Sequence, residues 1–280
     1  MSDDPRALLE ASELQGLQEA ALSFSDTCRE VIKAAANRGV DIHVKPDQSL
    51  VTNADIAAER AFRERVEQDF PGMGVLGEEF GHTRADSAWQ WVIDPVDGTA
   101  DFAHGLPIWG SIIGLFFHGE PVAGVIDHPD LDMRVHAAFG LGAYRNGERL
   151  SLSDFDPALD HGKARIGIPS RSNFVKRSAD GAVFDALASA YPDFRVFRSC
   201  LTHTYAATGQ LDAALEWDVN LWDLAATRIV IEEAGGRYLS LRERMHPGTG
   251  MLYCAVFGRP ALADRISALL AAQAGGPEAS

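Results

Sequence analysis

Two aspartates three positions apart, Asp94 and Asp97, follow an apolar run and precede Gly98 and Thr99. The run is short, aromatic and β-branched, which is typical of a buried strand. Pro95 restricts its own φ and disfavours a helical conformation at Asp94, so we expect the strand to end in a rigid turn. Gly98 permits a close approach to the backbone, and Thr99 is expected to cap a following helix. Such a turn could hold a hard cation through its carboxylates and an anion through its N–H groups.

Three further acids stand at expected element ends: Asp55, Glu78 and Asp223. Each has an ordinary explanation, because a helix dipole favours Asp55 and Asp223 near helix starts and Glu78 suits a solvated loop. If all the acids converge in one cavity, their charges require compensation. Mg²⁺ prefers carboxylate and carbonyl oxygens, and two such ions about 3.5–4 Å apart can clamp a phosphoryl group. The acids therefore predict metal-assisted phosphoryl transfer, with an acidic surface as the alternative.

Hydrophobic periodicity and turn residues predict the elements that must position these acids. We expect one long or two consecutive helices over 6–37, and further helices over 53–69, 172–190, 200–208, 222–234 and 261–272. We expect a strand or a hairpin over 40–52, and strands over 75–76, 89–93, 111–117, 122–126, 132–139, 142–145, 163–168, 194–198, 211–216 and 236–240. The pattern breaks over 156–161, which predicts an N-terminal lobe, 1–155, of helices and a mainly antiparallel sheet, and a C-terminal α/β lobe, 156–280.

Composition limits the class of partner. The chain has 280 residues, 46% of them hydrophobic, and a formal net charge of −15, which suits a globular enzyme and disfavours binding to nucleic-acid polymers or anionic membranes. Its three cysteines are far apart, so neither a disulfide framework nor a zinc ribbon is indicated. The acidic N-terminus does not resemble a signal peptide, and no apolar run reaches the roughly 18–20 residues of a membrane span. We expect a cytoplasmic protein without a membrane partner.

Other catalytic templates do not fit. Haloacid-dehalogenase phosphatases need D-x-D-G-T, and Pro95 stands at the position of their nucleophilic aspartate. The chain contains no G-x-S-x-G, no P-loop and no G-x-G-x-x-G, so the corresponding nucleophilic and nucleotide sites are not predicted. The nine histidines include no H-E-x-x-H, which argues against zinc hydrolysis.

The ordered motifs resemble those of a known family, the inositol monophosphatase-like, Mg²⁺-dependent phosphatases. The motifs are Gly77-Glu78-Glu79, Asp94-Pro95-Val96-Asp97-Gly98-Thr99 and Trp222-Asp223-Leu224-Ala225-Ala226. The resemblance runs from about residue 20 to about residue 240 and includes Phe102-Ala103-His104-Gly105-Leu106-Pro107 and Glu233-Ala234-Gly235-Gly236. It implies an α/β fold, a layered αβαβα sandwich of the sugar-phosphatase type, with the active site between two lobes.

The resemblance also implies a role for each matching position. A first Mg²⁺ would be held by Glu78, Asp94 and the Val96 carbonyl, a second by Asp94, Asp97 and Asp223, and a weaker third near Glu78. Thr99, hydrogen-bonded to Asp55, would act with Glu78 on the attacking water. Substrate contacts are expected at Asp97, Gly98, Thr99, Ser199, Cys200, Glu216 and Asp223, with the Gly98 and Thr99 N–H groups on the phosphate and Glu216 on the alcohol.

One departure and one ambiguity concern the substrate. Arg198 stands where the family commonly has glycine; it could recognise a second anionic group or point to solvent. The stretch 125–129 is similar to the histidinol-phosphatase branch and 102–107 to the inositol monophosphatase branch. We expect a small phosphate monoester such as inositol monophosphate, with histidinol phosphate as the alternative. A 3′(2′),5′-bisphosphate nucleotide and a catalytically silent regulatory homologue are lesser alternatives. The resemblance further implies a homodimer and inhibition by Li⁺ at the second metal.

Overall fold

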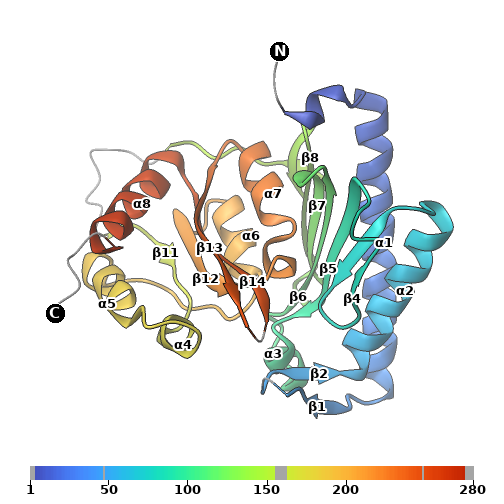
Figure 1. Cartoon of the computed structure of the whole chain (residues 1–280), viewed down its shortest axis with the longest axis horizontal. Helices are drawn as coiled ribbons and strands as arrows, with labels where there is room; N and C mark the ends of the chain where they lie inside the picture. Colours follow the sequence, from blue (N-terminus) through green and yellow to red (C-terminus); the bar gives the residue numbers. More distant parts are fainter. Residues whose placement is uncertain (1–3, 47, 155–162, 248, 275–280) are drawn as a thin grey trace. The chain divides into compact units, whose positions relative to one another are not determined.

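The computed structural model describes residues 4–46, 48–154, 163–247 and 249–274 and divides into two compact units (Figure 1). The first unit comprises Met1–Arg149, Ser199–Leu201 and Trp222–Glu233. The second comprises Leu150–Arg198, Thr202–Leu221 and Ala234–Ser280. The expected lobe boundary after residue 155 lies outside the described residues, and the division there stays a prediction.

An eight-stranded sheet forms the centre of the first unit. Its described strands lie in the order β10-β9-β8-β7-β6-β5-β3-β4, and every pair is antiparallel except β3 and β5. The strands are β3 Gly74–Gly77, β4 Gly81–Thr83, β5 Trp89–Asp97, β6 Gly110–Phe117, β7 Glu120–His128, β8 Met133–Ala138, β9 Gly142–Arg145 and β10 Glu148–Arg149. A separate hairpin pairs β1, Ile42–Val44, with β2, Leu50–Thr52.

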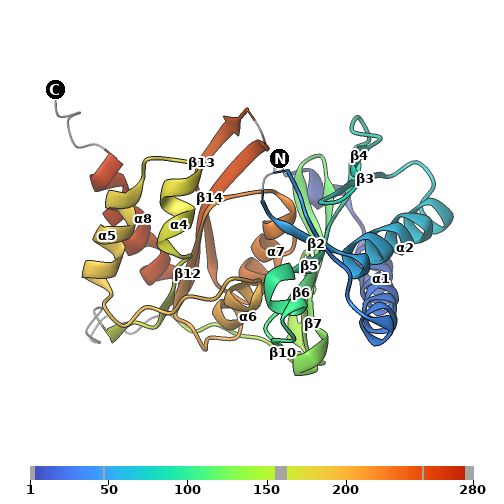
Figure 2. The same cartoon turned by 90° about the horizontal axis from the view of Figure 1, so that it is seen from below.

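Helices cover both faces of this sheet (Figures 1 and 2). The long helices α1, Ala11–Arg38, and α2, Asn53–Asp69, pack on one face, and α7, Thr227–Glu233, packs on the other. The buried side of α1 and α2 meets the sheet in an aromatic cluster, in which Phe24 lies 5.6 Å from Phe62 and 5.1 Å from Trp91 between ring centroids. Short helices complete the unit: η1 Pro5–Leu8, α3 Thr99–Ala103, η2 Pro129–Leu131 and η4 Trp222–Leu224.

Two glycines let the η4–α7 segment lie directly on the sheet. A Cβ at Gly114 of β6 would stand 2.2 Å from the Ala225 carbonyl oxygen, and one at Gly124 of β7 would stand 2.8 Å from the Ala226 Cα. Real Cβ atoms do not approach other heavy atoms so closely, so both positions need glycine. The small residues of the W-D-L-A-A motif therefore seat η4 against β5 and β6.

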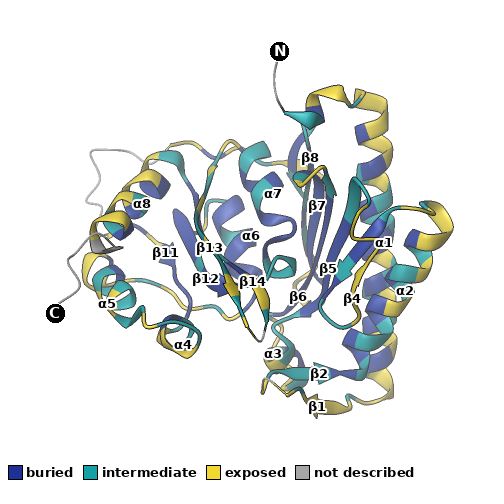
Figure 3. Ribbon diagram, in the orientation of Figure 1, coloured by how far each residue is buried: buried dark blue, intermediate teal, exposed yellow. Residues whose placement is uncertain are grey.

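The second unit is built on a four-stranded sheet, in the order β11-β12-β14-β13. Its strands are β11 Ile166–Gly167, β12 Ala213–Val219, β13 Arg237–His246 and β14 Gly250–Gly258. Its helices are α4 Arg171–Lys176, α5 Gly181–Ala190, α6 Leu201–Ala207, which starts in the first unit, and α8 Pro260–Ala274. Most residues of β12 are buried, and Figure 3 colours buried residues dark blue. Leu215 of β12 and Val256 of β14 belong to one buried cluster with Phe174 of α4 and Leu262 of α8.

The predicted α/β class is confirmed, and most predicted elements are present. Three predictions for the second unit differ from the structure. Strand β14, which pairs antiparallel with β13, is not among the expected strands, although residues 252–257 are largely apolar. The expected strand over 194–198 is reduced to one bridge, between Gly167 and Arg195. The expected helix over 172–190 is two helices, since the chain leaves α4 after Lys176 and restarts at Gly181. Among the described residues, no helix combines the length and the apolar character that crossing a bilayer requires.

Candidate active site

A β-bulge brings Asp94 and Asp97 to the same face of the sheet. Side chains alternate along a regular strand, so residues three positions apart would point to opposite faces. Asp94 is paired with Ile112 and Asp97 with Gly110, so two residues of β5 stand opposite one residue of β6. Since Ile112 and Gly110 are two positions apart and share a face, their partners share one too. The strand thus continues through the bulge to Asp97, and the expected end at residue 93 is wrong.

The segment η4 supplies a third carboxylate. It packs against β5 and β6, where Gly114 accommodates the Ala225 carbonyl. Carboxylate oxygens of Asp94, Asp97 and Asp223 all lie within 4.8 Å of one another. Three acids from two distant stretches of the sequence therefore form one close group within the first unit.

Asp94 is the most deeply buried member of this group, with 2% of its surface exposed. Its Oδ1 accepts a hydrogen bond from the Val96 N–H at 3.1 Å, and no Lys or Arg of the described residues pairs with it. Burial raises the pKa of Asp94 well above its usual range, and neighbouring charges raise it further, those of Glu78, Asp97, Asp223 and Asp55. Buried carboxylates in such proximity are stabilised when a cation neutralises them. The all-oxygen donor set fits Mg²⁺.

Glu78 lies outside the close group and pairs with a lysine. It follows β3, and its backbone N–H donates to the Ile93 carbonyl at 3.3 Å. Lys45 Nζ, from the β1–β2 hairpin, lies 2.8 Å from Glu78 Oε1 and 2.7 Å from Glu79 Oε1. Burial raises the pKa of Glu79 to about 7, although Lys45 acts in the opposite direction. The two adjacent acids thus share one cation supplied by the chain itself.

Thr99 and Asp55 lie next to each other. The Thr99 hydroxyl donates to the Val96 carbonyl at 3.0 Å and lies 3.5 Å from Asp55 Oδ1. The other oxygen of Asp55 accepts from the N–H and hydroxyl of Thr52, at 2.9 Å and 2.5 Å, and so completes the capping box of α2. Burial raises the pKa of Asp55 to about 6, against the opposing effect of the Thr52 hydrogen bonds. The buried Asp55 therefore joins the start of α2 to the start of α3.

The cap of α3 differs from the expectation. Gly98, not Thr99, occupies the cap position, with a φ of 86°, and Thr99 is the first helical residue. Glycine adopts this left-handed conformation without strain, because it has no Cβ. The Thr99 hydroxyl is therefore available to Val96 and Asp55 instead of the helix N–H groups.

Ser199 and Cys200 also belong to the first unit. The Cys200 N–H donates to the Asp97 carboxylate, and the Ser199 hydroxyl donates to the Ile108 carbonyl. The Cys200 thiol is fully buried, and burial raises its pKa well above the usual range. The Cys200 N–H thus contacts the acid cluster, and the buried Cys200 thiol lies beside the same Asp97 carboxylate.

Glu216 lies on β12 of the second unit. Its Oε1 is 3.1 Å from Nε2 of His203, a buried residue of α6, and no Lys or Arg of the described chain pairs with it. Arg198 is exposed and makes no hydrogen bond or ion pair with another described residue. Exposure to solvent is common to both expectations for this arginine, and its role stays a prediction.

Sequence reasoning missed two charged residues near Glu78. Lys45 pairs with Glu78, and Glu59 accepts hydrogen bonds from the N–H groups of Glu79 and Phe80. The signal for Glu59 was present, because it stands four positions after Asp55 on one helix and therefore shares its face. Two acids on the buried face of α2 that also carries Phe62 indicate that they accept hydrogen bonds inside the fold. Lys45 gives no such local signal.

The comparisons with known proteins point to one family of phosphatases. The sequence model of the inositol monophosphatase family matches residues 13–273. A histidinol-phosphatase of Mycobacterium tuberculosis is 37% identical over 227 residues, which are 79% of this chain and 86% of that protein. An inositol-1-monophosphatase of Mesorhizobium japonicum is 30% identical over 228 residues, 80% of this chain and 82% of that protein.

A solved structure shows the same fold. The inositol monophosphatase from Anabaena (Nostoc) sp. PCC 7120 superposes with a TM-score of 0.76 at 27% identity. The superposition covers 92% of this chain and 96% of that chain. The layered α/β sandwich expected from the sequence is therefore confirmed.

Proposed function

The chain belongs to the inositol monophosphatase family, and from this premise we propose that it is a Mg²⁺-dependent phosphatase acting on a small phosphate monoester. The observation that carries the proposal is the close group of Asp94, Asp97 and Asp223. A group of carboxylates around a buried member suits divalent cations better than it suits an acid–base pair.

Four acids and one carbonyl would hold the metal ions: Asp94, Asp97, Asp223, Glu78 and Val96 O. When bound, Mg²⁺ supplies charge neutralisation at the phosphoryl oxygens and Lewis-acid activation of a water. Glu78 would hold a metal ion beside Lys45, whose Nζ lies 2.8 Å from Glu78 Oε1. The Cys200 N–H keeps the Asp97 carboxylate oriented.

The remaining residues position the phosphate and the attacking water. Phosphoryl transfer depends on positioning and charge stabilisation more than on covalent chemistry by the protein. We assign the water to Thr99 and Glu78, with Asp55 as the acceptor that orients the Thr99 hydroxyl. The backbone N–H groups of Gly98 and Thr99, together with Ser199 and Cys200, are assigned to the phosphate end of the substrate.

For the alcohol, we propose L-histidinol first and myo-inositol second. Sequence reasoning preferred inositol; the 37% identity with a histidinol-phosphatase, against 30% with an inositol-1-monophosphatase, supports the reverse order. The assigned alcohol contact, Glu216, supports it too. The Glu216 carboxylate has a histidine as partner and no Lys or Arg among the described residues. It could therefore accept charge-assisted hydrogen bonds from the ammonium group of an amino alcohol.

Three further properties follow from the family resemblance alone: a homodimer, inhibition by Li⁺ and a cytoplasmic location. They stay predictions. Size measurement in solution and inhibition by LiCl at constant ionic strength test the first two directly.

Phosphate release with and without Mg²⁺ tests the proposed function. The substrates are L-histidinol phosphate, myo-inositol 1-phosphate and adenosine 3′,5′-bisphosphate, and the matched variant is Asp94→Asn. We expect Mg²⁺-dependent turnover that Asp94→Asn lowers by about 10³-fold or more while the circular dichroism spectrum is unchanged, since the charge that attracts the cation is lost. Absence of turnover on every substrate would indicate a silent homologue, and turnover without a divalent cation would refute the metal mechanism.

A further inference from the structure

We propose that Glu59 and Arg63 are positioning residues that hold the Glu78 turn, residues 77–80, in the conformation that metal binding needs. The inference rests on the proposed role of Glu78 as a metal ligand. It concerns two side chains of α2 that touch no expected ligand side chain and act through the backbone.

Glu59 anchors the Glu78 turn from the helix side. Its side chain is 0% exposed, and its two oxygens accept from consecutive N–H groups, from Glu79 at 2.7 Å and from Phe80 at 3.1 Å. On the sheet side, the Glu78 N–H donates to the Ile93 carbonyl at 3.3 Å. The backbone on both sides of the Glu78 side chain is therefore fixed, one side by β5 and the other by α2.

Gly77 provides independent support. A Cβ at this position would lie 2.1 Å from Glu59 Oε1 and 2.3 Å from its Cδ. The Glu59 carboxylate therefore packs against the backbone at the exact place where β3 ends and the Glu78 turn begins. The glycine of the G-E-E motif is explained by this contact, because any side chain would displace the carboxylate.

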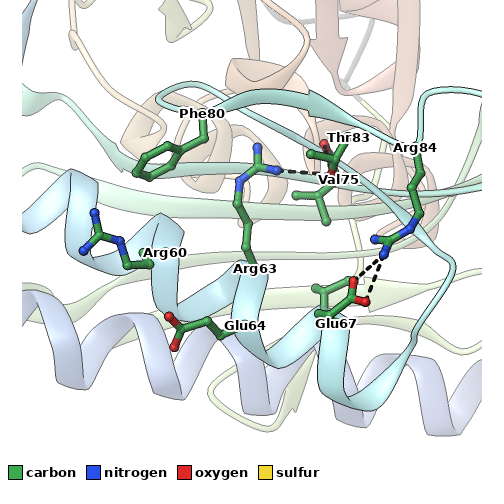
Figure 4. Close-up of a pocket in the computed structure, with 9 residues that line it drawn as sticks. Arg60, Arg63, Glu64, Glu67, Val75, Phe80, Thr83 and Arg84 are labelled. Atoms are coloured by element: carbon green, nitrogen blue, oxygen red, sulfur yellow. Dashed lines mark hydrogen bonds and ion pairs between the residues drawn. The ribbon is translucent and has the colours of Figure 1, made fainter.

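Arg63 completes the arrangement. Its Nε donates to Glu59 Oε1 at 2.8 Å, and its terminal nitrogens donate to the Gly81 carbonyl at 2.5 Å and to Thr83 Oγ1 at 3.3 Å. Figure 4 shows Arg63 rising from α2 between Phe80 and Thr83. It compensates the buried charge of Glu59, which would otherwise be costly, and joins it to β4 beyond the turn.

The neighbouring charged residues of α2 provide a contrast. Glu64 is exposed and forms no hydrogen bond with a described residue, whereas the exposed Arg60 lies 6.0 Å from the centre of the Phe80 ring. A buried ion pair is weak evidence for stability as such, because its desolvation cost offsets most of the attraction. Glu59 is bonded to backbone N–H groups, so its contribution is the shape of the turn. Groups that orient metal ligands in this way typically change metal affinity about 10- to 100-fold when removed.

A surface pocket makes Arg63 accessible to a small solute. The pocket, of about 620 Å³, is lined by Arg63 and Phe80 with residues of α2, β3 and β4 (Figure 4). An alkylguanidinium ion can therefore enter the space that the Arg63 side chain vacates when it is truncated. This permits a rescue experiment that separates positioning from a general loss of stability.

The test measures Mg²⁺ binding by isothermal titration calorimetry without substrate, and then kcat and KM. For Glu59→Gln and Arg63→Ala we expect a Kd for Mg²⁺ about 10- to 100-fold higher than in the wild type. Excess Mg²⁺ should restore most of kcat, and ethylguanidinium should restore Mg²⁺ affinity to Arg63→Ala only. The matched control Glu64→Gln, which changes an exposed acid of the same helix, should bind Mg²⁺ as the wild type does.

Several results would overturn the inference. Folded Glu59→Gln and Arg63→Ala with wild-type Mg²⁺ affinity would do so, as would a loss that neither excess Mg²⁺ nor ethylguanidinium reverses. If Glu59→Gln does not fold, Arg63→Lys is the deciding variant. Lysine keeps the positive charge but lacks the planar set of N–H donors of the guanidinium, so we expect this variant to bind Mg²⁺ more weakly than the wild type does. A wild type that binds no Mg²⁺ and releases no phosphate would instead overturn the proposed function, and the inference with it.

Discussion

The Thr99 hydroxyl has one proton and two acceptors within reach. The Val96 carbonyl lies at 3.0 Å and Asp55 Oδ1 at 3.5 Å, and a hydroxyl can donate to only one of them at a time. The shorter bond goes to the carbonyl that the family resemblance assigns to a metal ion. Metal binding at Val96 would compete for the carbonyl lone pairs and favour rotation of the hydroxyl toward Asp55. Under the proposed function, Thr99 would thus connect the metal site to a buried acid without being a ligand.

Replacing Thr99 with alanine tests this role. We expect Thr99→Ala to lower kcat by about 10²- to 10³-fold, because a positioned proton-transfer group is lost. Its Kd for Mg²⁺, measured by calorimetry, should change by less than about threefold, since the Val96 carbonyl remains. Thr99→Ser, which keeps the hydroxyl, is the control and should retain most activity. Equal losses of turnover and of Mg²⁺ affinity would mean that the role of Thr99 is structural.

At the scale of elements, two irregularities assemble the acid group. The bulge in β5 rotates Asp97 to the face of Asp94. The glycines of β6 and β7 remove the side chains that would keep η4 and its Asp223 away from that sheet. A regular strand with ordinary side chains would separate the same three acids. Their convergence therefore depends on residues that carry no charge.

Gly114→Ala tests the seating of η4. The added Cβ would stand 2.2 Å from the Ala225 carbonyl oxygen, and we expect a loss of about 1–3 kcal/mol in the free energy of unfolding. Mg²⁺ binding should weaken as well, because Asp223 moves with η4. Gly16→Ala is the control: it lies in α1 with nothing within 4 Å of the new Cβ, and it should stabilise the helix by up to about 1 kcal/mol. Wild-type Mg²⁺ affinity in Gly114→Ala would refute this account of the site.

The second unit has an ionic cluster next to the bulge of β12. Asp218, 2% exposed, accepts from Arg242 at 3.0 Å and from Arg244 at 2.7 Å. Burial would raise the pKa of Asp218, but the Arg244 and Arg242 contacts lower it below its ordinary value. Because the pKa of Asp218 is lower in the folded state than in the unfolded state, its ionised carboxylate stabilises the fold above a pH of about 4. This contribution is lost as the pH falls through the folded-state pKa.

Asp218→Asn should therefore destabilise the second unit in a pH-dependent manner. In urea denaturation we expect a loss of about 3 kcal/mol at pH 7, because two arginines lose their buried partner. The difference from the wild type should shrink as pH falls toward 3. Asp185→Asn is the control, since the Asp185–Arg171 pair is largely exposed and should be worth less than about 1 kcal/mol. A pH-independent difference would show that charge is not the cause.

At the scale of the whole molecule, a net charge of −15 makes cation binding favourable for folding. Any ion that binds the folded state and not the unfolded one adds stability, about 2.7 kcal/mol at a concentration 100 times its Kd. Specific sites and general screening both contribute to such an effect. They differ in that screening depends only on ionic strength.

Thermal unfolding with MgCl₂ separates the two contributions. We expect MgCl₂ to raise Tm by several degrees more than NaCl at equal ionic strength, and EDTA to reverse the rise, because the acid group binds Mg²⁺ only when folded. Asp94→Asn should lose this difference between the salts. Identical Tm values in both salts for the wild type would argue against a specific metal site.

Local patterns in the chain were sufficient for several conclusions. The motifs around Glu78, Asp94 and Asp223 indicated the family and the acids, because residue type and spacing within one turn depend on short-range chemistry. Periodicity located α1, α2 and the strands β5 to β9, since a buried face imposes its repeat on the sequence. The class of reaction followed from these motifs before any tertiary contact was considered.

Only the tertiary structure decided how the acids meet. It placed Asp94 and Asp97 on one face through a bulge, brought Asp223 to them over Gly114, and paired Glu78 with Lys45. It also inserted β14 between β12 and β13. These contacts join residues far apart in the chain, and the free energy that selects them comes from packing and charge compensation between elements. No local repeat of the sequence encodes such partners, so they become visible only when the elements are in place.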